Sequence, residues 1–275
     1  MARFTTSDGL SLYYSDEGTG LPLLCLAGLT RDGRDFDFVA PHLTGLRLIR
    51  LDYRGRGRSH WGKSATYTVA VEARDALELL DHLRIERAAI LGTSRGGLIA
   101  MLLAATAKSR LLGVALNDIG PEIAPEGLEV IKGYLGKTPP WTTLQEAIKA
   151  RRGAMSGFVN LPVGRWEEEA RRLYRETPDG LQLPYDPSLR EAVLGDGAQP
   201  VPDLWPLFDA LEDLPLCLIR GANSDLLRAE TFSKMRRRRP DAIYAQVADR
   251  GHIPFLDEPD ALLALWAWLA KLCVY

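Results

Sequence analysis

Short apolar runs alternate with amphipathic stretches along most of the chain. Apolar runs at residues 21–27, 46–51, 87–90, 111–116, 214–220 and 243–247 have the length expected of strands in a buried parallel sheet. Between the second and third runs, apolar side chains recur at steps of three and four behind Thr68, a typical helix cap, and predict a helix to Leu83. Strands that alternate with helices predict an α/β fold with a mostly parallel, doubly wound sheet.

The pattern changes at both ends of the chain and again in its middle. Residues 3–6 and 11–15 flank Asp8-Gly9 and predict a hairpin, a helix is expected at 34–43, and another should close the chain at 259–272. From Pro121 to Pro202 the sequence is helix-prone and interrupted by prolines. We therefore predict a core domain of residues 1–120 and 203–275 with an inserted helical cap at 121–202. The alternative is a peripheral helical decoration that meets no substrate.

Composition and charge restrict the choice of partners. The 275 residues are 46% hydrophobic and 25% charged, with a formal charge of −2, so we expect neither a nucleic acid nor a membrane surface as partner. The three cysteines form no C-x-x-C motif, and the amino terminus has no apolar signal segment. We expect a cytoplasmic protein. Its oligomeric state stays open, a homo-oligomer included.

The segment Gly92-Thr93-Ser94-Arg95-Gly96 lies between a predicted strand and a predicted helix. This G-x-S-x-G spacing is typical of a nucleophile elbow, a tight turn that holds a serine hydroxyl above the sheet. Larger side chains at Gly92 or Gly96 would collide with the neighbouring strand or helix. We predict that Ser94 is a catalytic nucleophile.

A serine hydroxyl needs a base to accept its proton and an acid to orient that base. His252 follows the last predicted strand and is the favoured base, with His60 as the alternative. Asp225 follows the strand at 214–220 and is the favoured acid, while Asp118, also at a strand end, competes for the role.

Backbone amides must stabilise the oxyanion that forms during attack on a carbonyl. The amide of Arg95, directly after the nucleophile, is one predicted donor. The loop Ala27-Gly28-Leu29-Thr30, directly after the first long strand, should supply the other, which we assign to Leu29.

These motifs together resemble the α/β-hydrolase superfamily. Besides the elbow, residues 52–59 resemble its D-x-R-G-x-G-x-S loop, residues 221–225 its acid loop, and residues 251–254 its histidine loop. The resemblance implies an α/β-hydrolase fold, a catalytic triad, a cap that shapes the pocket, and neither cofactor nor metal. Ala27 departs from the pattern, because many members carry histidine there. Serine at the nucleophile position argues against the similar epoxide hydrolases and haloalkane dehalogenases, which use aspartate.

The expected function is that of a serine hydrolase, carboxylesterase-like (EC 3.1.1 type), acting on a small to medium ester-like substrate. A lactonase, a C–C hydrolase of diketones, and a hydrolase-like receptor with little turnover are the alternatives. Trp141 and Tyr134, with other cap aromatics, are candidates for the substrate pocket or for the cap's own core. Arg151 and Arg152 leave an acidic substrate open.

Residues 57–64 fit the phosphate-loop pattern G-x-x-x-x-G-K-[ST]. A phosphate loop must connect a strand directly to a helix, whereas here the strand ends at Leu51 and the helix begins only after Thr68. We therefore expect no nucleotide.

Overall fold

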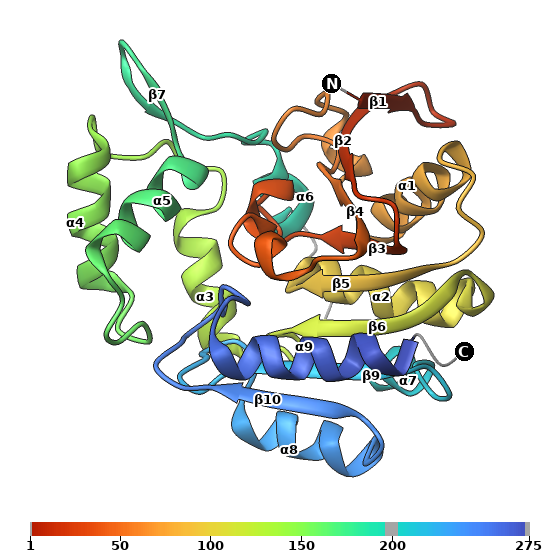
Figure 1. Cartoon of the computed structure of the whole chain (residues 1–275). Coiled ribbons are helices and arrows are strands. Elements are labelled where there is room, and N and C mark those ends of the chain that lie inside the picture. Colours follow the sequence, from red (N-terminus) through yellow and green to blue (C-terminus); the bar gives the residue numbers. More distant parts are fainter. Residues whose placement is uncertain (1, 196–202, 273–275) are drawn as a thin grey trace.

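A computed structural model describes residues 2–195 and 203–272 of the chain. Its centre is a sheet in the order β1-β2-β4-β3-β5-β6-β9-β10 (Figure 1). Neighbouring strands from β4 to β10 are parallel, and β1 and β2 are joined antiparallel at one edge. The strands are β1 (Ala2–Thr5), β2 (Ser11–Glu17), β3 (Leu21–Leu26), β4 (Leu46–Leu51), β5 (Ala88–Thr93), β6 (Leu111–Asn117), β9 (Leu216–Gly221) and β10 (Ile243–Val247). The predicted α/β class and the predicted amino-terminal hairpin are confirmed.

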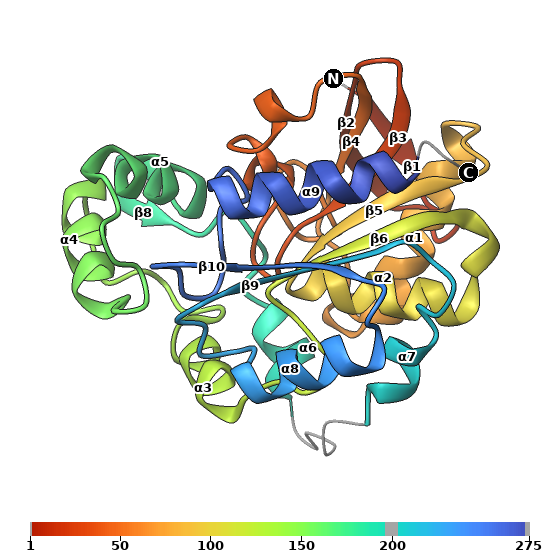
Figure 2. The same ribbon diagram turned by 60° about the horizontal axis from the view of Figure 1, so that its bottom comes forward.

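Helices cover both faces of this sheet, as Figure 2 shows. One face carries α1 (Val69–His82), α2 (Arg95–Thr106), α7 (Trp205–Asp209) and α8 (Ala229–Arg238), and the other carries α9 (Pro259–Leu272). Side chains of β3 alternate accordingly, with Leu24 and Leu26 in the core beneath α1 and α2 and Leu23 and Cys25 in the core beneath α9. A sheet buried on both faces explains the apolar runs of the sequence.

The prediction of a helix at residues 34–43 is wrong. The segment forms two short 3-10 helices, Gly33–Phe36 and Ala40–His42. Pro41 stands in the second half of the predicted helix, where it has no amide to donate and its ring would clash with the preceding turn. The first of these helices is capped by Asp32, whose carboxylate accepts the amide of Arg34 at 3.0 Å.

The segment between β6 and β9 is mainly helical, as predicted, but also contains a hairpin that the sequence analysis missed. Its elements are α3 (Pro125–Tyr134), α4 (Leu144–Ala154), α5 (Val163–Leu173), β7 (Arg175–Thr177), β8 (Gly180–Gln182) and α6 (Leu189–Leu194). Figure 1 shows α4, α5 and β7 beside the sheet. We call residues 121–195 the helical insert. The end of the predicted cap, residues 196–202, lies outside the described residues.

None of the helices in the described ranges combines the length and the apolar character that crossing a membrane requires.

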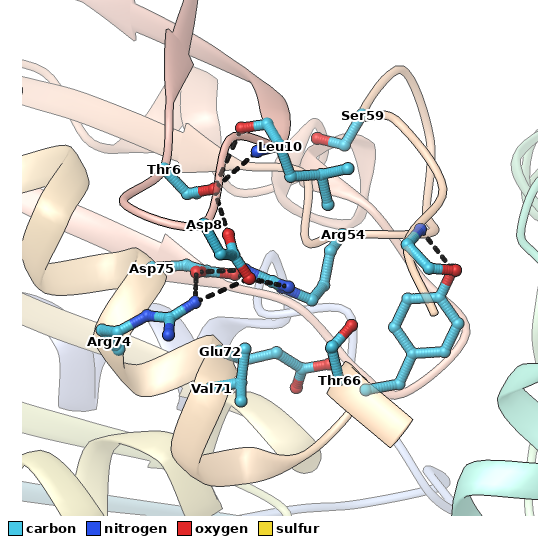
Figure 3. A network of polar contacts seen from close by, with 12 residues as sticks. Thr6, Asp8, Leu10, Arg54, Ser59, Thr66, Val71, Glu72, Arg74 and Asp75 are labelled. Atoms are coloured by element: carbon cyan, nitrogen blue, oxygen red, sulfur yellow. Dashed lines mark hydrogen bonds and ion pairs between the residues drawn. The ribbon is translucent and has the colours of Figure 1, made fainter. Parts of the chain in front are cut away.

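The loop that follows β4 is anchored by buried charges (Figure 3). Arg54 donates from Nε and Nη2 to the two carboxylate oxygens of Asp75, at 2.6 and 2.7 Å, and both side chains are fully buried. Nη1 of Arg54 reaches Asp8, on the turn between β1 and β2, at 2.9 Å. The two-pronged pair joins the loop to helix α1, and the contact with Asp8 joins it to the hairpin.

Asp75→Ala should lower the free energy of unfolding by about 3 to 5 kcal/mol, because it leaves the buried Arg54 guanidinium without its main partner. Urea unfolding followed by circular dichroism measures this change. The control is Arg74→Ala, which removes a half-exposed cation next to the same carboxylates and should cost no more than about 1 kcal/mol. Equal, small losses for both variants would show that the buried pair contributes no more to the free energy of unfolding than the contacts of Arg74.

Candidate active site

Ser94 occupies the turn between β5 and α2. Its backbone has φ of 50° and ψ of −113°, a strained conformation for a residue with a side chain. A Cβ at Gly92 would lie 2.5 Å from the carbonyl oxygen of Gly96, and one at Gly96 would collide with the backbone of Leu26 on β3. The steric reason predicted for both glycines is therefore confirmed, and the turn holds Ser94 at the carboxyl end of the sheet.

The side chains of Ser94, His252 and Asp118 form one hydrogen-bonded series. Nε2 of His252 lies 3.0 Å from Oγ of Ser94, and Nδ1 lies 2.7 Å from Oδ2 of Asp118. A carboxylate can only accept, so Nδ1 carries the imidazole proton and Nε2 is left to accept the hydroxyl proton of Ser94. The segments that carry Ser94 and Asp118 also meet directly, since the Ser94 amide donates to the carbonyl of Asn117 at 3.0 Å.

The prediction that Asp225 orients His252 is wrong. Asp225 is exposed, and within residues 2–195 and 203–272 its carboxylate forms no hydrogen bond with His252. Its neighbour Ser224 points inward instead and donates to Asp118 at 2.6 Å. Asp118, the alternative acid in the sequence analysis, directly follows the last residue of β6, whereas Asp225 stands four residues beyond β9. This closeness to the strand end is the signal that favours Asp118.

His60, the alternative base, does not reach the site. It is exposed in the loop after β4, and its backbone amide donates to the carbonyl of Ser11 on β2. His252 is thus the histidine that the structure places beside Ser94.

The loop after β3 lies against Ser94, and buried side chains hold it in place. A Cβ at Gly28 would lie 3.9 Å from that of Ser94. The carbonyl of Ala27 accepts the Tyr53 hydroxyl at 3.1 Å, and the carbonyl of Leu29 accepts Nε of Arg56 at 2.9 Å. Two buried side chains therefore hold this loop, which has alanine where many members of the superfamily that the sequence resembles carry histidine.

A single carboxylate links the two predicted oxyanion residues. Glu72, fully buried on α1, pairs with Arg56 at 2.8 Å and also with the guanidinium of Arg95. Arg56 in turn holds the Leu29 carbonyl. Arg95 is the first residue of α2, so its backbone amide has no carbonyl acceptor within the helix. The amide of Leu29 donates to no backbone carbonyl in the described part of the chain.

A small cavity adjoins His252 on the side of the helical insert. Its volume is about 10 Å³, about the space that one water molecule needs. Met155, Phe158 and Trp166 of the insert give it apolar walls, together with Ile253 and Phe255 of the histidine loop. Arg31, Arg151 and Glu169 give it charge. A ligand larger than one water molecule would fit here only if these insert side chains moved apart.

The two aromatic residues predicted for the substrate pocket do not line this cavity. Trp141 packs in the insert's own small core, with its ring centre 5.9 Å from that of Tyr174. Tyr134 is half-exposed at the end of α3, close enough to Arg31 and Arg151 for their charges to act on its phenol. The cavity instead uses Phe158 and Trp166, two other aromatics of the same insert.

Comparison with known proteins agrees with this fold. A family model described as the alpha/beta hydrolase fold matches residues 22–259. The chain belongs to the α/β-hydrolase family.

Three relatives of this α/β hydrolase are informative. It is 36% identical over 260 residues to a 3-hydroxybutyrate-oligomer hydrolase of Cupriavidus necator, covering 90% of this chain and 87% of the relative. The crystal structure of an α/β hydrolase from Novosphingobium aromaticivorans has 38% identity and a TM-score of 0.91, covering 98% and 97% of the two chains. A thermophilic esterase of Thermogutta terrifontis, solved with malate bound, has 26% identity and a TM-score of 0.75, with 98% of both chains covered.

An ion-pair cluster joins the helical insert of this hydrolase to the loop after β3. Arg31 lies 3.0 Å from Glu169 on α5 and 3.2 Å from Asp35. Burial raises the pKa of Asp35 to about 7. Arg31 and Arg172 oppose this rise, while the carboxylates of Glu169 and Asp32 add to it. One oxygen of Asp35 is buried without a hydrogen-bond partner, which agrees with a carboxyl group that keeps its proton.

The raised pKa makes stability depend on pH. Between about pH 4 and pH 7 the folded chain keeps a proton that the unfolded chain has released, so the free energy of unfolding falls as the pH rises. A pKa of about 7 against an ordinary 3.8 corresponds to a loss of at most about 4 kcal/mol. Asp35→Asn should flatten this part of the pH profile in urea unfolding. Asp37→Asn, on a more exposed carboxylate, should keep the slope, and an equal slope in Asp35→Asn and wild type would contradict the assignment.

Proposed function

We propose that this hydrolase cleaves small to medium carboxylic esters through an acyl-enzyme on Ser94. The observation that carries the proposal is the series from the Ser94 hydroxyl through His252 to Asp118, with distances of 3.0 and 2.7 Å. A serine hydroxyl paired with a base that is itself oriented by a buried carboxylate is the arrangement that nucleophilic catalysis needs.

In the acylation step, Oγ of Ser94 attacks the ester carbonyl while Nε2 of His252 accepts its proton. Asp118 keeps the other imidazole proton on Nδ1 and stabilises the imidazolium that forms. The amides of Leu29 and Arg95 donate to the oxyanion of the tetrahedral intermediate. Since Glu72 and Arg56 hold the segments that carry these amides, the donors are positioned before the charge develops.

The tetrahedral intermediate then collapses, with the imidazolium of His252 as the proton donor. His252 gives its proton to the leaving oxygen, the carbon–oxygen bond breaks, and the alcohol departs. A water molecule next loses a proton to His252 and attacks the acyl-enzyme. Collapse of this second intermediate releases the acid and returns the proton to Ser94, so one water is consumed for each ester cleaved.

Two relatives favour an ester over other bonds. The Cupriavidus necator relative is named for the hydrolysis of 3-hydroxybutyrate oligomers, in which a hydroxyl of one unit is esterified by the carboxyl of the next. The Thermogutta terrifontis relative is an esterase. The apolar walls contributed by Met155, Phe158 and Trp166 suit a short carbon chain.

Release of p-nitrophenol from acetate, butyrate and octanoate esters tests the proposal. Ser94→Ala should lower kcat by about 10⁴-fold or more, because it removes the attacking atom. The profile over chain length then measures how far the insert side chains open. If wild type and Ser94→Ala are equally inactive on all three esters, the esterase proposal is wrong.

The choice between the two carboxylates has its own test. Asp118→Asn should lower kcat by about 10³- to 10⁴-fold, because the amide no longer holds His252 in the tautomer that can accept the serine proton. Asp225→Asn removes an exposed carboxylate from the same region and should stay within about twofold of wild type. A large loss in Asp225→Asn with little loss in Asp118→Asn would reverse the assignment.

A further inference from the structure

Arg151 is a cation without a carboxylate partner beside His252. It lies in the last turn of α4 and lines the cavity together with the imidazole. Its Nε is buried and has no hydrogen-bond partner in the described part of the chain. Its Nη2 contacts the sulfur of Met155 at 3.0 Å, and a thioether is only a weak acceptor. A guanidinium in this state lacks the planar, two-oxygen partner that it binds best.

The other charges of the cavity balance one another. Arg31 lies 3.0 Å from the carboxylate of Glu169, which already balances its positive charge, and 3.2 Å from the carboxyl group of Asp35. Glu169 is occupied by this pair, which leaves Arg151 as the cavity cation that faces no anion of the chain within residues 2–195 and 203–272. A ligand with one negative charge would balance the positive charge of Arg151.

The position of the cavity indicates which part of a substrate enters it. His252 lines the cavity, whereas neither Ser94 nor Leu29 does. The space therefore opens beside the imidazole of the reacting pair, between the histidine loop, the helical insert and the side chain of Arg31. His252 must deliver a proton to the leaving oxygen, so the leaving alcohol is the part of an ester that lies next to it.

We propose that Arg151 binds a carboxylate on the alcohol part of the substrate, so that the preferred substrates are esters of hydroxy acids with a free carboxyl group. This inference rests on the proposed esterase function. The two carboxylate oxygens would take the Nε and Nη2 donors of Arg151 in place of the contact with Met155. The flexible thioether can move aside at small cost. The apolar side chains around it would exclude water and strengthen the charged contact.

A matched pair of substrates isolates the carboxylate. 3-Acetoxybutyrate carries it on the leaving alcohol, and 3-acetoxybutanamide replaces it by a neutral amide of nearly the same shape. Acetate release gives kcat/KM for each. The enzyme variants are Arg151→Gln, Arg151→Lys and the control Arg152→Gln, which removes an exposed arginine from the same turn of α4. Thermal unfolding midpoints show that each variant is folded.

Wild type should prefer the acid to the amide, and Arg151→Gln should lower the ratio of the two kcat/KM values by about 10- to 100-fold, as expected for loss of a charged hydrogen-bonded contact. Arg151→Lys should fall in between, because it keeps the charge but not the two-pronged geometry. Arg152→Gln should keep the wild-type ratio.

The failure of this inference is distinct from failure of the esterase proposal. If wild type cleaves p-nitrophenyl esters through Ser94 but shows no preference for the acid, or if Arg151→Gln and Arg152→Gln change the ratio equally, the carboxylate site is refuted and the esterase proposal stands. If wild type cleaves none of these esters, both are refuted.

Discussion

The buried carboxylate of Asp118 is the contact on which the geometry of the site depends. Its oxygens accept the Gly221 amide at 2.8 Å, the Ser224 hydroxyl at 2.6 Å and the imidazole of His252 at 2.7 Å. Three separate segments, the ends of β6 and β9 and the histidine loop, therefore converge on one fully buried anion. Burying an ionised carboxylate is costly unless donors surround it, so the fold that satisfies Asp118 also places His252 opposite Ser94.

The opposite side of the site is held by a second buried anion. Glu72 pairs with Arg56 and Arg95 and so connects the loop after β3 to the first turn of α2. Preorganised donors are effective because they need no rearrangement when charge develops. Backbone strain at Ser94 is maintained because the flanking elements fix it from both sides. Alanine at position 27 is compatible with a well-positioned oxyanion loop, because hydrogen bonds to the backbone carbonyls hold this loop in place.

Local patterns were sufficient to predict much of the fold and two of the three residues in the hydrogen-bonded series, Ser94 and His252. Strand runs and the G-x-S-x-G spacing are encoded in neighbouring residues, so the sheet and the elbow around Ser94 could be read directly. The acid could not be settled in this way, because Asp118 and Asp225 both follow strands, and only packing in three dimensions turns Ser224 inward and Asp225 outward. The side chains of the insert that face the cavity were harder still to predict. Whether Trp141 or Trp166 faces the cavity depends on how α4 and α5 pack, and amphipathic helices of similar composition leave this open.

The central claim is that Ser94 is a nucleophile activated by His252. Labelling with a fluorophosphonate, which phosphonylates activated serines with loss of fluoride, tests it without a choice of substrate. Peptide mass spectrometry should find one label per chain, on the peptide that contains Ser94, and His252→Ala should slow labelling by orders of magnitude. Labelling at another serine, or labelling of Ser94 at the same rate in His252→Ala, would contradict the account.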